Sequence, residues 1–350
     1  MSKIIEGSLG TEDPNASERK KDHISLAFQS VVTGEELDKR FYYEPVLAGH
    51  PDSGISLSKS FLGKTFDMPV WVSSMTGGTA MAGTINKNLA RACSDFGMGM
   101  GLGSCRQLLY DDTFLGDFQL RKIIGGQPLY ANLGIAQIIS LLAEGKIHLI
   151  HTLLEKLEAD GLIIHINPLQ EWLQPEGDRY YMSPLEAVQR LLEKMNSYKI
   201  IVKEVGQGMG KKSLEALLAL PLAAIDFAAS GGTNFALLEL LRTEAGHQHD
   251  LKPLANVGHS ALEMVQMVNQ IKAEMPDKVL CPEVIISGGI RDFLDGYYLI
   301  NSCNISAVYG QASGFLKFAM GSYEELHHYV SKQKEGLLMA NTFLRIKQKP

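Results

Sequence analysis

Residues 161–194 read GLIIHINPLQEWLQPEGDRYYMSPLEAVQRLLEK, and they contain one complete unit of strand, loop and helix. The continuous apolar run at 161–166 is typical of a parallel strand that is covered on both faces. The motif SPLE at 183–186 indicates a helix start, because serine can cap the helix, proline suits its first position and glutamate can complete a capping box. The apolar residues that follow recur at helical spacing and predict one buried helix face, formed by Leu185, Val188, Leu191, Leu192 and Met195.

The same order of apolar run, polar loop and amphipathic segment recurs along the chain. The apolar runs are 69–75, 98–103, 128–134, 161–166, 200–204, 222–227, 284–287 and 305–309. Eight strands alternating with helices predict an α/β protein with a single (β/α)8 TIM barrel, although a doubly wound open sheet is compatible with the same pattern. A second capping-box motif, SALE at 260–263, marks another of the expected helices.

The remaining segments lie at the two ends of this barrel and inside one of its connections. Residues 1–22 are polar and end in the basic run Arg19, Lys20, Lys21, so a flexible basic N-terminal arm is expected. Residues 23–350 are assigned to one barrel domain, whose first part precedes the barrel. The polar stretch 242–250 predicts an inserted loop, and 322–344 predicts a closing C-terminal helix.

Composition and charge exclude several classes of protein. The chain of 350 residues has a formal net charge of −6, whereas a general nucleic-acid binder carries a strongly basic domain. Its 4 cysteines show no C-x-x-C spacing, and no apolar segment like a signal peptide opens the chain, so a reduced, cytoplasmic protein is expected. The apolar runs are far shorter than the roughly 20 residues of a membrane span. We therefore expect neither a nucleic-acid nor a membrane partner.

The end of the strand at 161–166 carries an unusual set of polar side chains. In an α/β barrel the active site lies at the carboxyl ends of the strands. His165 and Asn167 lie on one side of this strand by period-two alternation, and Gln170 and Glu171 follow in the loop. A single carboxylate suits Mg²⁺, which keeps several waters and takes substrate phosphate oxygens as further ligands. Glu171 is therefore a candidate magnesium ligand, and an ordinary loop carboxylate is the alternative.

Three other strand ends point to anion binding. Lys203 lies in the apolar run 200–204 and requires an anionic or electron-rich partner, because lysine is almost never fully buried alone. Glu204 is an unsuitable partner, since adjacent strand residues point in opposite directions. After the seventh and eighth strands, SGGIR at 287–291 and YGQASG at 309–314 predict a site for a cofactor phosphate, where barrels often bind one.

A second anion site is also expected, for a metal-bound phosphorylated group. Glu171 and Arg106 are available at strand ends, and the arm supplies Arg19, Lys20 and His23. These cations would let the arm close over the site. The alternative is that the arm is a solvated run of charge.

Nine motifs in order extend this pattern along the chain. They are RKKDHI (19–24), SSMTGG (73–78), GSCRQ (103–107), ANLG (131–134), HINPLQE (165–171), KEVGQG (203–208), SGGTNF (230–235), SGGIRD (287–292) and GQASGFL (310–316). The glycine turns are common to many flavin-binding barrels, whereas HINPLQE together with RKKDHI is much more specific. From Arg19 to about Ala319 the chain resembles the type 2 isopentenyl diphosphate isomerases, the flavin-dependent (β/α)8 form of that enzyme.

The resemblance implies interconversion of isopentenyl diphosphate and dimethylallyl diphosphate by proton transfer through reduced FMN, with Mg²⁺ on the diphosphate and NADPH as the reductant. It also implies a homo-oligomer, a tetramer or an octamer. The FMN contacts it implies are Ser74, Met75, Thr76, Ser104, Asn132, Lys203, Thr233, Gly288, Gly289, Gln311 and Ala312. The implied diphosphate contacts are Arg19, Lys20, His23, Ser104, Arg106, His165, Asn167 and Gln170. Gln170, His165 and Lys203 would be catalytic, and Glu171 would hold Mg²⁺.

Three departures from this family and two other functions have to be weighed, and one departure is the segment 292–298, where the family is usually richer in alanine and glycine. Ala228 and Cys105 stand where serine and glutamine are common in the family. An FMN-dependent 2-hydroxy acid oxidase or dehydrogenase would need a His/Arg pair late in the barrel, and His259 is the only candidate histidine in that part of the sequence. A flavin-binding protein without turnover would not need the polar groups of HINPLQE.

Overall fold

The computed structural model describes residues 15–51, 54–73, 80–242 and 248–347. The chain divides into two units, Met1–Phe41 and Tyr42–Pro350. In the first unit, α1 (Ala16–Leu26) has no buried residue among those described. The helix continues past residue 22 and thus differs from the arm with little structure of its own that polarity predicted. Good helix formers such as Glu18 and Lys20 favour it, and the absence of an apolar stripe hid it from a reading of hydrophobic periodicity.

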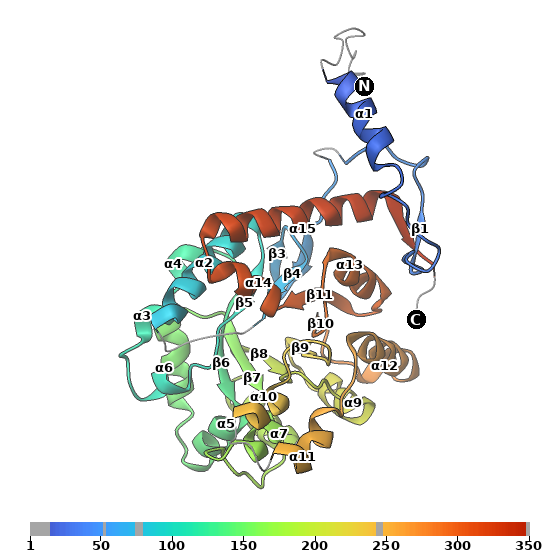
Figure 1. The fold of residues 1–350 in the computed structure, drawn as a ribbon. Helices are drawn as coiled ribbons and strands as arrows, with labels where there is room; N and C mark the ends of the chain where they lie inside the picture. Colours follow the sequence, from blue (N-terminus) through green and yellow to red (C-terminus); the bar gives the residue numbers. More distant parts are fainter. Residues whose placement is uncertain (1–14, 52–53, 74–79, 243–247, 348–350) are drawn as a thin grey trace. The chain divides into compact units, whose positions relative to one another are not determined.

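Eight parallel strands in the second unit close into a barrel, which confirms the predicted TIM-barrel fold (Figure 1). They are β4 (Val70–Val72), β5 (Gly99–Gly101), β6 (Leu129–Gly134), β7 (Gly161–His165), β8 (Lys199–Lys203), β9 (Ala224–Asp226), β10 (Glu283–Ser287) and β11 (Ser306–Gln311). Closure rests on the pairing of the last strand with the first, where Tyr309 lies opposite Val70. The open-sheet alternative is therefore wrong.

Helices follow the strands around the outside of the barrel. They are α2 (Ala80–Phe96), α3 (Leu115–Phe118), α4 (Arg121–Ile124), α5 (Ile135–Ala143), α6 (His148–Leu157), α7 (Pro168–Leu173), α8 (Pro184–Lys194), α9 (Lys211–Leu218), α10 (Phe235–Arg242), α11 (Gln248–Ala255), α12 (Ala261–Glu274), α13 (Phe293–Ser302), α14 (Ser313–Ala319) and α15 (Tyr323–Phe343). Short 3-10 helices lie at η1 (Arg106–Leu109) and η2 (Pro276–Lys278). Among the described helices, none is long and apolar enough to cross a membrane.

Capping residues place several of these helices where the sequence predicted them. At the start of α12, the Ser260 hydroxyl accepts from the Glu263 amide, and the Glu263 carboxylate accepts from the Ser260 amide. At α8 only the first half of the box forms, with the Ser183 hydroxyl accepting from the Glu186 amide. A full box at Ser322 starts α15, which confirms the closing helix.

The inserted segment between β9 and β10 differs from the predicted loop. Helix α11 begins at Gln248, so the last part of the stretch 242–250 is helical. Residues 243–247 lie outside the described part of the chain. The polar composition of this segment concealed the helix.

A hairpin closes the amino-terminal end of the barrel. It is formed by β2 (Lys59–Phe61) and β3 (Lys64–Phe66), which precede the barrel strands, while β1 (Phe41–Tyr43) and β12 (Leu344–Ile346) form a separate two-stranded sheet. The hairpin side chains Phe61 and Phe66 pack with residues from inside the barrel, including Trp71 and Ile163. A packed core therefore fills this end, and the opposite end is left for chemistry.

Candidate active site

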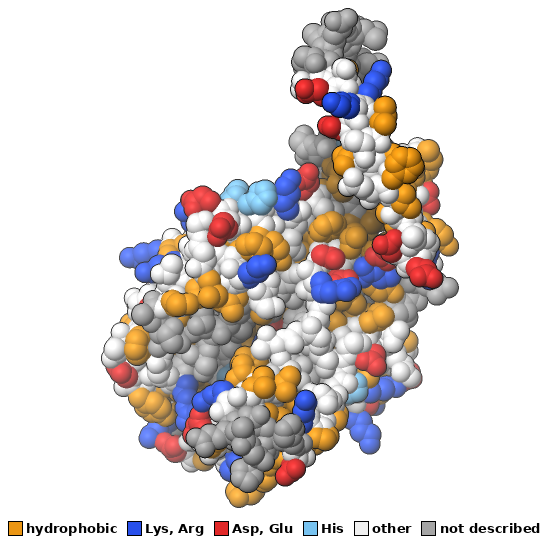
Figure 2. Space-filling view, viewed as in Figure 1, with side chains coloured by type: hydrophobic (Ala, Val, Ile, Leu, Met, Phe, Trp, Pro, Cys, Tyr) orange, Lys and Arg blue, Asp and Glu red, His pale blue; other side chains and the backbone are white. Residues whose placement is uncertain are grey.

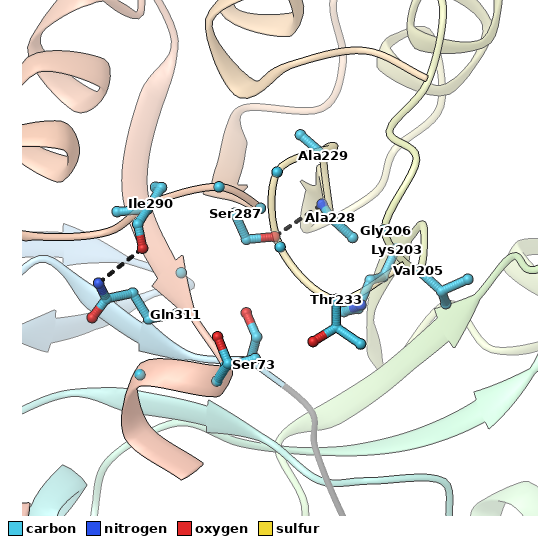
Figure 3. Close-up of a pocket in the computed structure, with 18 of the residues that line it drawn as sticks. Ser73, Lys203, Val205, Gly206, Ala228, Ala229, Thr233, Ser287, Ile290 and Gln311 are labelled. Carbon is cyan, nitrogen blue, oxygen red and sulfur yellow. Dashed lines mark hydrogen bonds between the residues drawn. The ribbon is translucent and has the colours of Figure 1, made fainter. Parts of the chain in front are cut away.

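A cavity of about 370 Å³ opens at the carboxyl ends of the strands, opposite the β2–β3 hairpin. Its volume lies in the range of small-molecule and cofactor pockets. Figure 3 shows Ser73, Lys203, Thr233 and Ser287 around it. The cavity is also lined by Ala228, Ala229, Gly231, Gly232, Gly288, Gly289, Ile290, Arg291, Gln311 and Ala312. The cavity thus gathers the predicted phosphate turns and the strand lysine.

The turns after β9 and β10 interlock, and glycine is required where they meet. The Ala229 amide donates to the Ser287 carbonyl at 2.9 Å. Gly288 has a φ of +91°, and a Cβ atom there would collide with the Ala229 backbone. Gly289 is also left-handed, with a φ of +71°. Without side chains in the way, backbone groups approach the cavity closely, as a phosphate cradle requires.

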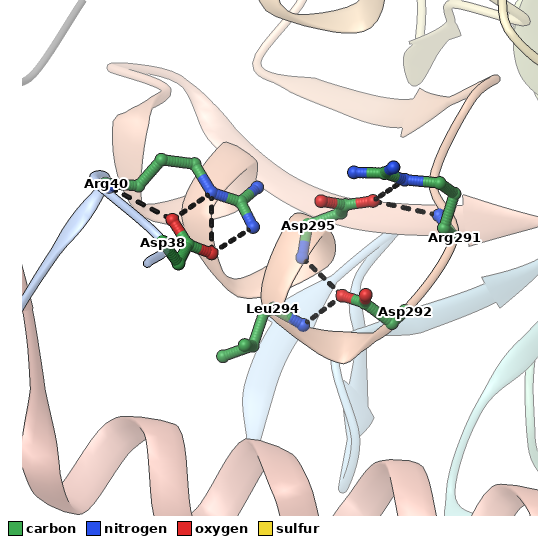
Figure 4. A network of polar contacts seen from close by, with 6 residues as sticks. All are labelled: Asp38, Arg40, Arg291, Asp292, Leu294 and Asp295. Atoms are coloured by element: carbon green, nitrogen blue, oxygen red, sulfur yellow. Dashed lines mark hydrogen bonds and ion pairs between the residues drawn. The ribbon is translucent and has the colours of Figure 1, made fainter. Parts of the chain in front are cut away.

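The turn after β10 is held by the start of α13 (Figure 4). The Asp292 carboxylate accepts from the amides of Leu294 at 2.9 Å and Asp295 at 3.0 Å. Arg291 Nε donates to the Asp295 carboxylate at 3.2 Å. Since Arg291 also lines the cavity, this network places a cation at its rim.

Gln311 lines the cavity, but its amide group is used for packing. Its Nε2 donates to the Ile290 carbonyl at 3.2 Å (Figure 3). Its Oε1 accepts from Gln333 Nε2 at 2.8 Å and from the Tyr329 hydroxyl at 3.2 Å, both on α15. Any contact of Gln311 with a cofactor phosphate would therefore come from its backbone.

Lys203 ends β8 and points into the barrel, while Glu204 points away from it. Lys203 is 8% exposed, and its Nζ donates to the Glu204 carbonyl at 2.7 Å. The Glu204 carboxylate accepts from three loop amides, those of Gly206, Gln207 and Gly208. Burial raises the pKa of Glu204, against the opposing effect of these hydrogen bonds. The predicted opposite orientation of the two side chains is confirmed.

His165 ends β7 as a neutral, oriented imidazole. The Asn132 amide nitrogen donates to the Leu102 carbonyl at 3.0 Å, which turns its oxygen toward His165 Nδ1 at 2.8 Å. Nδ1 therefore carries the proton, and Nε2 is left as an acceptor. Burial and the nearby Lys203 charge lower the pKa of His165 to about 3.

The residues after β7 form a hydrogen-bonded group on α7. Asn167 Nδ2 donates to Gln170 Oε1 and to Glu171 Oε1, each at 3.0 Å. The second Glu171 oxygen accepts from the Asp178 amide at 2.7 Å. Asn167 Oδ1 is buried and has no hydrogen-bond partner in the described part of the chain. The strand end thus holds one carboxylate beside one unused amide oxygen.

A second carboxylate, which the sequence did not single out, contacts Gln170. Gln170 Nε2 donates to Glu239 Oε1 at 3.1 Å, and the other Glu239 oxygen forms an ion pair with Arg242 at 2.6 Å. Glu239 is 2% exposed. Both Gln170 and Asn167 line a further cavity of about 550 Å³ between the ends of β7 and β8, which also includes His259.

Arg106 lies at the start of η1, where its guanidinium forms an ion pair with Asp178 at 3.0 Å. Ser104 is exposed just before it. The Cys105 thiol is fully buried and donates to the Gly103 carbonyl, and burial raises its pKa to about 12. The side chain at this departure from the family pattern therefore faces the protein interior.

Several predicted residues belong to the first unit or lie outside the described part of the chain. Arg19, Lys20 and His23 are exposed on α1, which belongs to the first unit. Ser74, Met75 and Thr76 lie outside the described residues. Among those described, no group of three or more His, Cys, Asp or Glu side chains forms a metal site.

Comparison with known proteins decides the family. No family model matches the chain. It is 34% identical to the isopentenyl-diphosphate delta-isomerase of Rickettsia felis over 307 residues, which covers 86% of this chain and 85% of the relative. It is 35% identical to the enzyme of that name from Pelodictyon phaeoclathratiforme over 302 residues, with 81% and 82% covered. The chain belongs to the isopentenyl-diphosphate delta-isomerase family.

Solved structures similar to this family member are TIM-barrel proteins. A mandelate oxidase mutant with an FMN adduct superimposes with a TM-score of 0.52 at 12% identity, covering 88% of each chain. A flavocytochrome b2 mutant superimposes with a TM-score of 0.58 at 13% identity, covering 95% of this chain and 76% of the other. At these identities the likeness shows the shared barrel alone.

The residues of this isomerase-family chain fit a phosphorylated planar cofactor. The glycine turns form the cradle, Lys203 supplies a buried cation, and Ser73 Oγ is buried without a hydrogen-bond partner in the described residues. The group at Glu171 and Asn167 likewise fits a cation that takes its other ligands from water and phosphate.

Four residues at the site were not predicted individually as contacts from the sequence, although Ser73 and Ser287 belong to the motifs SSMTGG and SGGIRD. Ser73 and Ser287 line the cavity, Glu239 contacts Gln170, and Asp226 is fully buried at the end of β9. A signal was available for Asp226, because a lone carboxylate in an apolar strand is as unusual as the lysine of β8. Glu239 lies on an amphipathic helix, where a carboxylate normally faces solvent.

Proposed function

We propose that this protein interconverts isopentenyl diphosphate and dimethylallyl diphosphate, using reduced FMN and Mg²⁺, with NADPH as the reductant of the flavin. One observation carries the proposal: the polar group of His165, Asn167, Gln170 and Glu171 ends the strand next to Lys203 and its glycine-lined cavity. A cavity that only binds FMN does not need this group. The family relationship supports the same reaction.

The cavity is suited to hold the cofactor in a defined orientation. Backbone groups of Gly288, Gly289 and Ala312 would surround the phosphate, with Gln311 contributing only its main chain. Lys203, Asn132 and Thr233 would contact the ring system, together with Ser104 and residues 74–76. When bound in its reduced form, FMN supplies proton transfer to an unactivated alkene, which no ordinary side chain can protonate at neutral pH.

Gln170 and His165 are the groups that would meet the reacting skeleton. Both ends of the Gln170 amide are hydrogen-bonded, to Asn167 and to Glu239, so its orientation is fixed. His165 presents the lone pair of Nε2 because its Nδ1 is bound to Asn132. His165 thus offers a lone pair that can accept a proton, Gln170 presents a fixed amide that would position the reacting carbons, and Lys203 provides the positive charge that stabilises an anionic reduced ring.

The diphosphate would lie at the end of β7, on the side of Arg106. Arg106 would exchange its ion pair with Asp178 for a phosphate oxygen, and Ser104, which follows β5, and Asn167, which follows β7, would also contact the diphosphate. Mg²⁺ on Glu171 would neutralise the remaining charge. In this proposal Arg19, Lys20 and His23 of the N-terminal arm also contact the diphosphate. The enzyme would act in the cytoplasm as a homo-oligomer, a tetramer or an octamer.

The variant Gln170→Ala tests the proposed chemistry. We expect loss of isomerisation with FMN retained, because Gln170 does not line the phosphate cavity. Isomerisation is followed by NMR of the product, and bound FMN by its absorbance. Gln174→Ala, at the end of the same helix, is the matched control and should remain active. Normal turnover of Gln170→Ala would remove Gln170 from the mechanism, and oxidation of lactate or mandelate by the wild type would favour an oxidase.

A further inference from the structure

Asp226 is a buried carboxylate beneath the cavity, and none of the roles assigned above uses it. It ends β9 and is 0% exposed. Its Oδ1 accepts from the Ser287 hydroxyl at 2.5 Å, and its Oδ2 is buried with no hydrogen-bond partner in the described residues. An unpaired carboxylate oxygen in the interior is destabilising, and either a positive charge nearby or protonation of the carboxyl group relieves the cost.

One side of Asp226 holds the two phosphate turns together. The Ser287 hydroxyl donates to Asp226 and accepts from the Ala228 amide at 2.9 Å (Figure 3). Ala228 has a φ of +40°, a conformation that is unfavourable for a residue with a Cβ atom. The hydrogen bond that the Ala228 amide donates to the Ser287 hydroxyl stabilises this conformation, and Asp226 orients that hydroxyl by accepting its proton in a second hydrogen bond. The turn after β9 is thereby fastened to the turn after β10.

The other side of Asp226 faces the strand that carries Lys203. Asp226 lies opposite Lys203 in the register of β8 and β9, and side chains of paired residues point to the same face. Burial raises the pKa of Asp226, against the opposing effects of the Lys203 charge and of hydrogen bonds from Ser287 and Ala228. Lys203 is thus a source of positive charge for the unpaired oxygen.

The other titratable groups around Lys203 already have hydrogen-bond partners of their own. From β7, the His165 imidazole is neutral and bound to Asn132. From β8, the Glu204 carboxylate is turned away and bound to loop amides. Asp226, from β9, is the remaining carboxylate among these three neighbours in the described structure.

We infer that Asp226 is a positioning residue of the flavin pocket, with one oxygen fastening the phosphate turns through Ser287 and its charge balancing the Lys203 ammonium. This inference rests on the proposed binding of FMN. Because Asp226 compensates part of the lysine charge, a bound flavin experiences less than the full field of Lys203. The hydrogen-bonding role of Asp226 and its charge role should therefore be separable by mutation.

The first test compares Asp226→Asn and Ser287→Ala with the wild type. The amide of Asp226→Asn can still accept from Ser287 but carries no charge, so we expect FMN affinity to stay within about threefold and the flavin midpoint potential to become more positive. Ser287→Ala keeps the charge but releases the turns, so it should weaken FMN binding more than riboflavin binding. Asp277→Asn, an exposed charge removal before β10, should change neither quantity.

Affinities are measured by quenching of flavin fluorescence, and the potential by equilibration with a reference dye. An unchanged potential in Asp226→Asn would overturn the charge role. Equal losses of FMN and riboflavin binding in Ser287→Ala would overturn the phosphate-turn role. Absence of FMN binding by the wild type would instead defeat the proposed function, and so the two failures are distinguishable.

The second test needs no cofactor and also covers the case in which Asp226→Asn folds poorly. Lys203→Met, Asp226→Asn and the double variant are unfolded with urea as apoproteins. A charge pair predicts that each single variant has a lower unfolding midpoint, since one buried charge is left alone, and that the double variant recovers part of the loss. Additive losses would contradict the pairing.

Discussion

At the scale of single residues, His165 shows how an environment sets a protonation state. Its folded pKa is about 3 against an ordinary value of 6.5, because burial and the Lys203 charge disfavour the imidazolium. Between these pH values the unfolded chain binds a proton that the folded chain does not. The contribution of His165 to stability is therefore complete above pH 6.5 and is lost as the pH falls from there toward 3.

This linkage predicts a smaller pH effect in His165→Asn. Urea unfolding at pH 7 and pH 5 should show that the wild type loses more of its free energy of unfolding at pH 5 than the variant does. The exposed His328→Asn is the matched control and should keep the wild-type difference. The same pH difference in all three proteins would show that the His165 imidazole is protonated at pH 5 in the folded protein, as it is in the unfolded chain.

Individual residues also show which contacts could be predicted from the sequence and which could not. The opposite orientation of Lys203 and Glu204 could be predicted, because strand geometry imposes alternation. The binding of the Gln311 amide to Gln333 and Tyr329 could not, since those partners lie on the closing helix, far along the chain. The role of Asp226 likewise became visible only in the structure, where the pairing of β8 with β9 places Lys203 opposite it.

At the scale of elements, the two phosphate turns depend on glycine for a steric reason. Gly288→Ala would strain a left-handed backbone and drive a Cβ atom into Ala229. Strain of about 1–3 kcal/mol predicts a loss of FMN affinity of roughly tenfold or more, at 1.4 kcal/mol for each factor of ten. Fluorescence titration with FMN measures the loss.

The control variant Gly145→Ala introduces a left-handed alanine without a steric collision, and so separates the effect of backbone strain from that of the contact with Ala229. Gly145 has a φ of +68° and nothing within 4 Å of an added Cβ, and it lies after α5, outside the cavity. We expect this variant to be less stable but to bind FMN normally. If both alanine variants bound FMN like the wild type, the contact between the two turns would have no part in cofactor binding.

Elements with strong local signals could be predicted, and those without them could not. The box at Ser260 and the apolar face of α8 were readable because capping and periodicity are local. Helix α1 carries polar residues on most positions and α11 on half of them, and neither sequence showed a helical apolar period. The half-formed box at Ser183 shows that a motif specifies the possible hydrogen bonds but not which of them form.

At the scale of the whole molecule, the eightfold repeat of strand and helix predicted the barrel, and closure between β11 and β4 confirmed it. Lysine, arginine, aspartate and glutamate are interspersed over the face seen in Figure 2, in keeping with a chain that has no strongly basic domain. The cations for the proposed phosphorylated ligands are local instead, with Arg106 available to the diphosphate and with Arg291 and Lys203 at the cofactor cavity.

The measurement that tests the central claim most directly is an anaerobic isomerase assay with the purified wild-type protein. Isopentenyl diphosphate is added with Mg²⁺ and FMN that has been reduced by dithionite, and the product is identified by NMR. The account predicts conversion to dimethylallyl diphosphate, and no conversion when the FMN is left oxidised or when Mg²⁺ is removed with EDTA. No conversion with reduced FMN and Mg²⁺, or equal conversion with oxidised FMN, would contradict it.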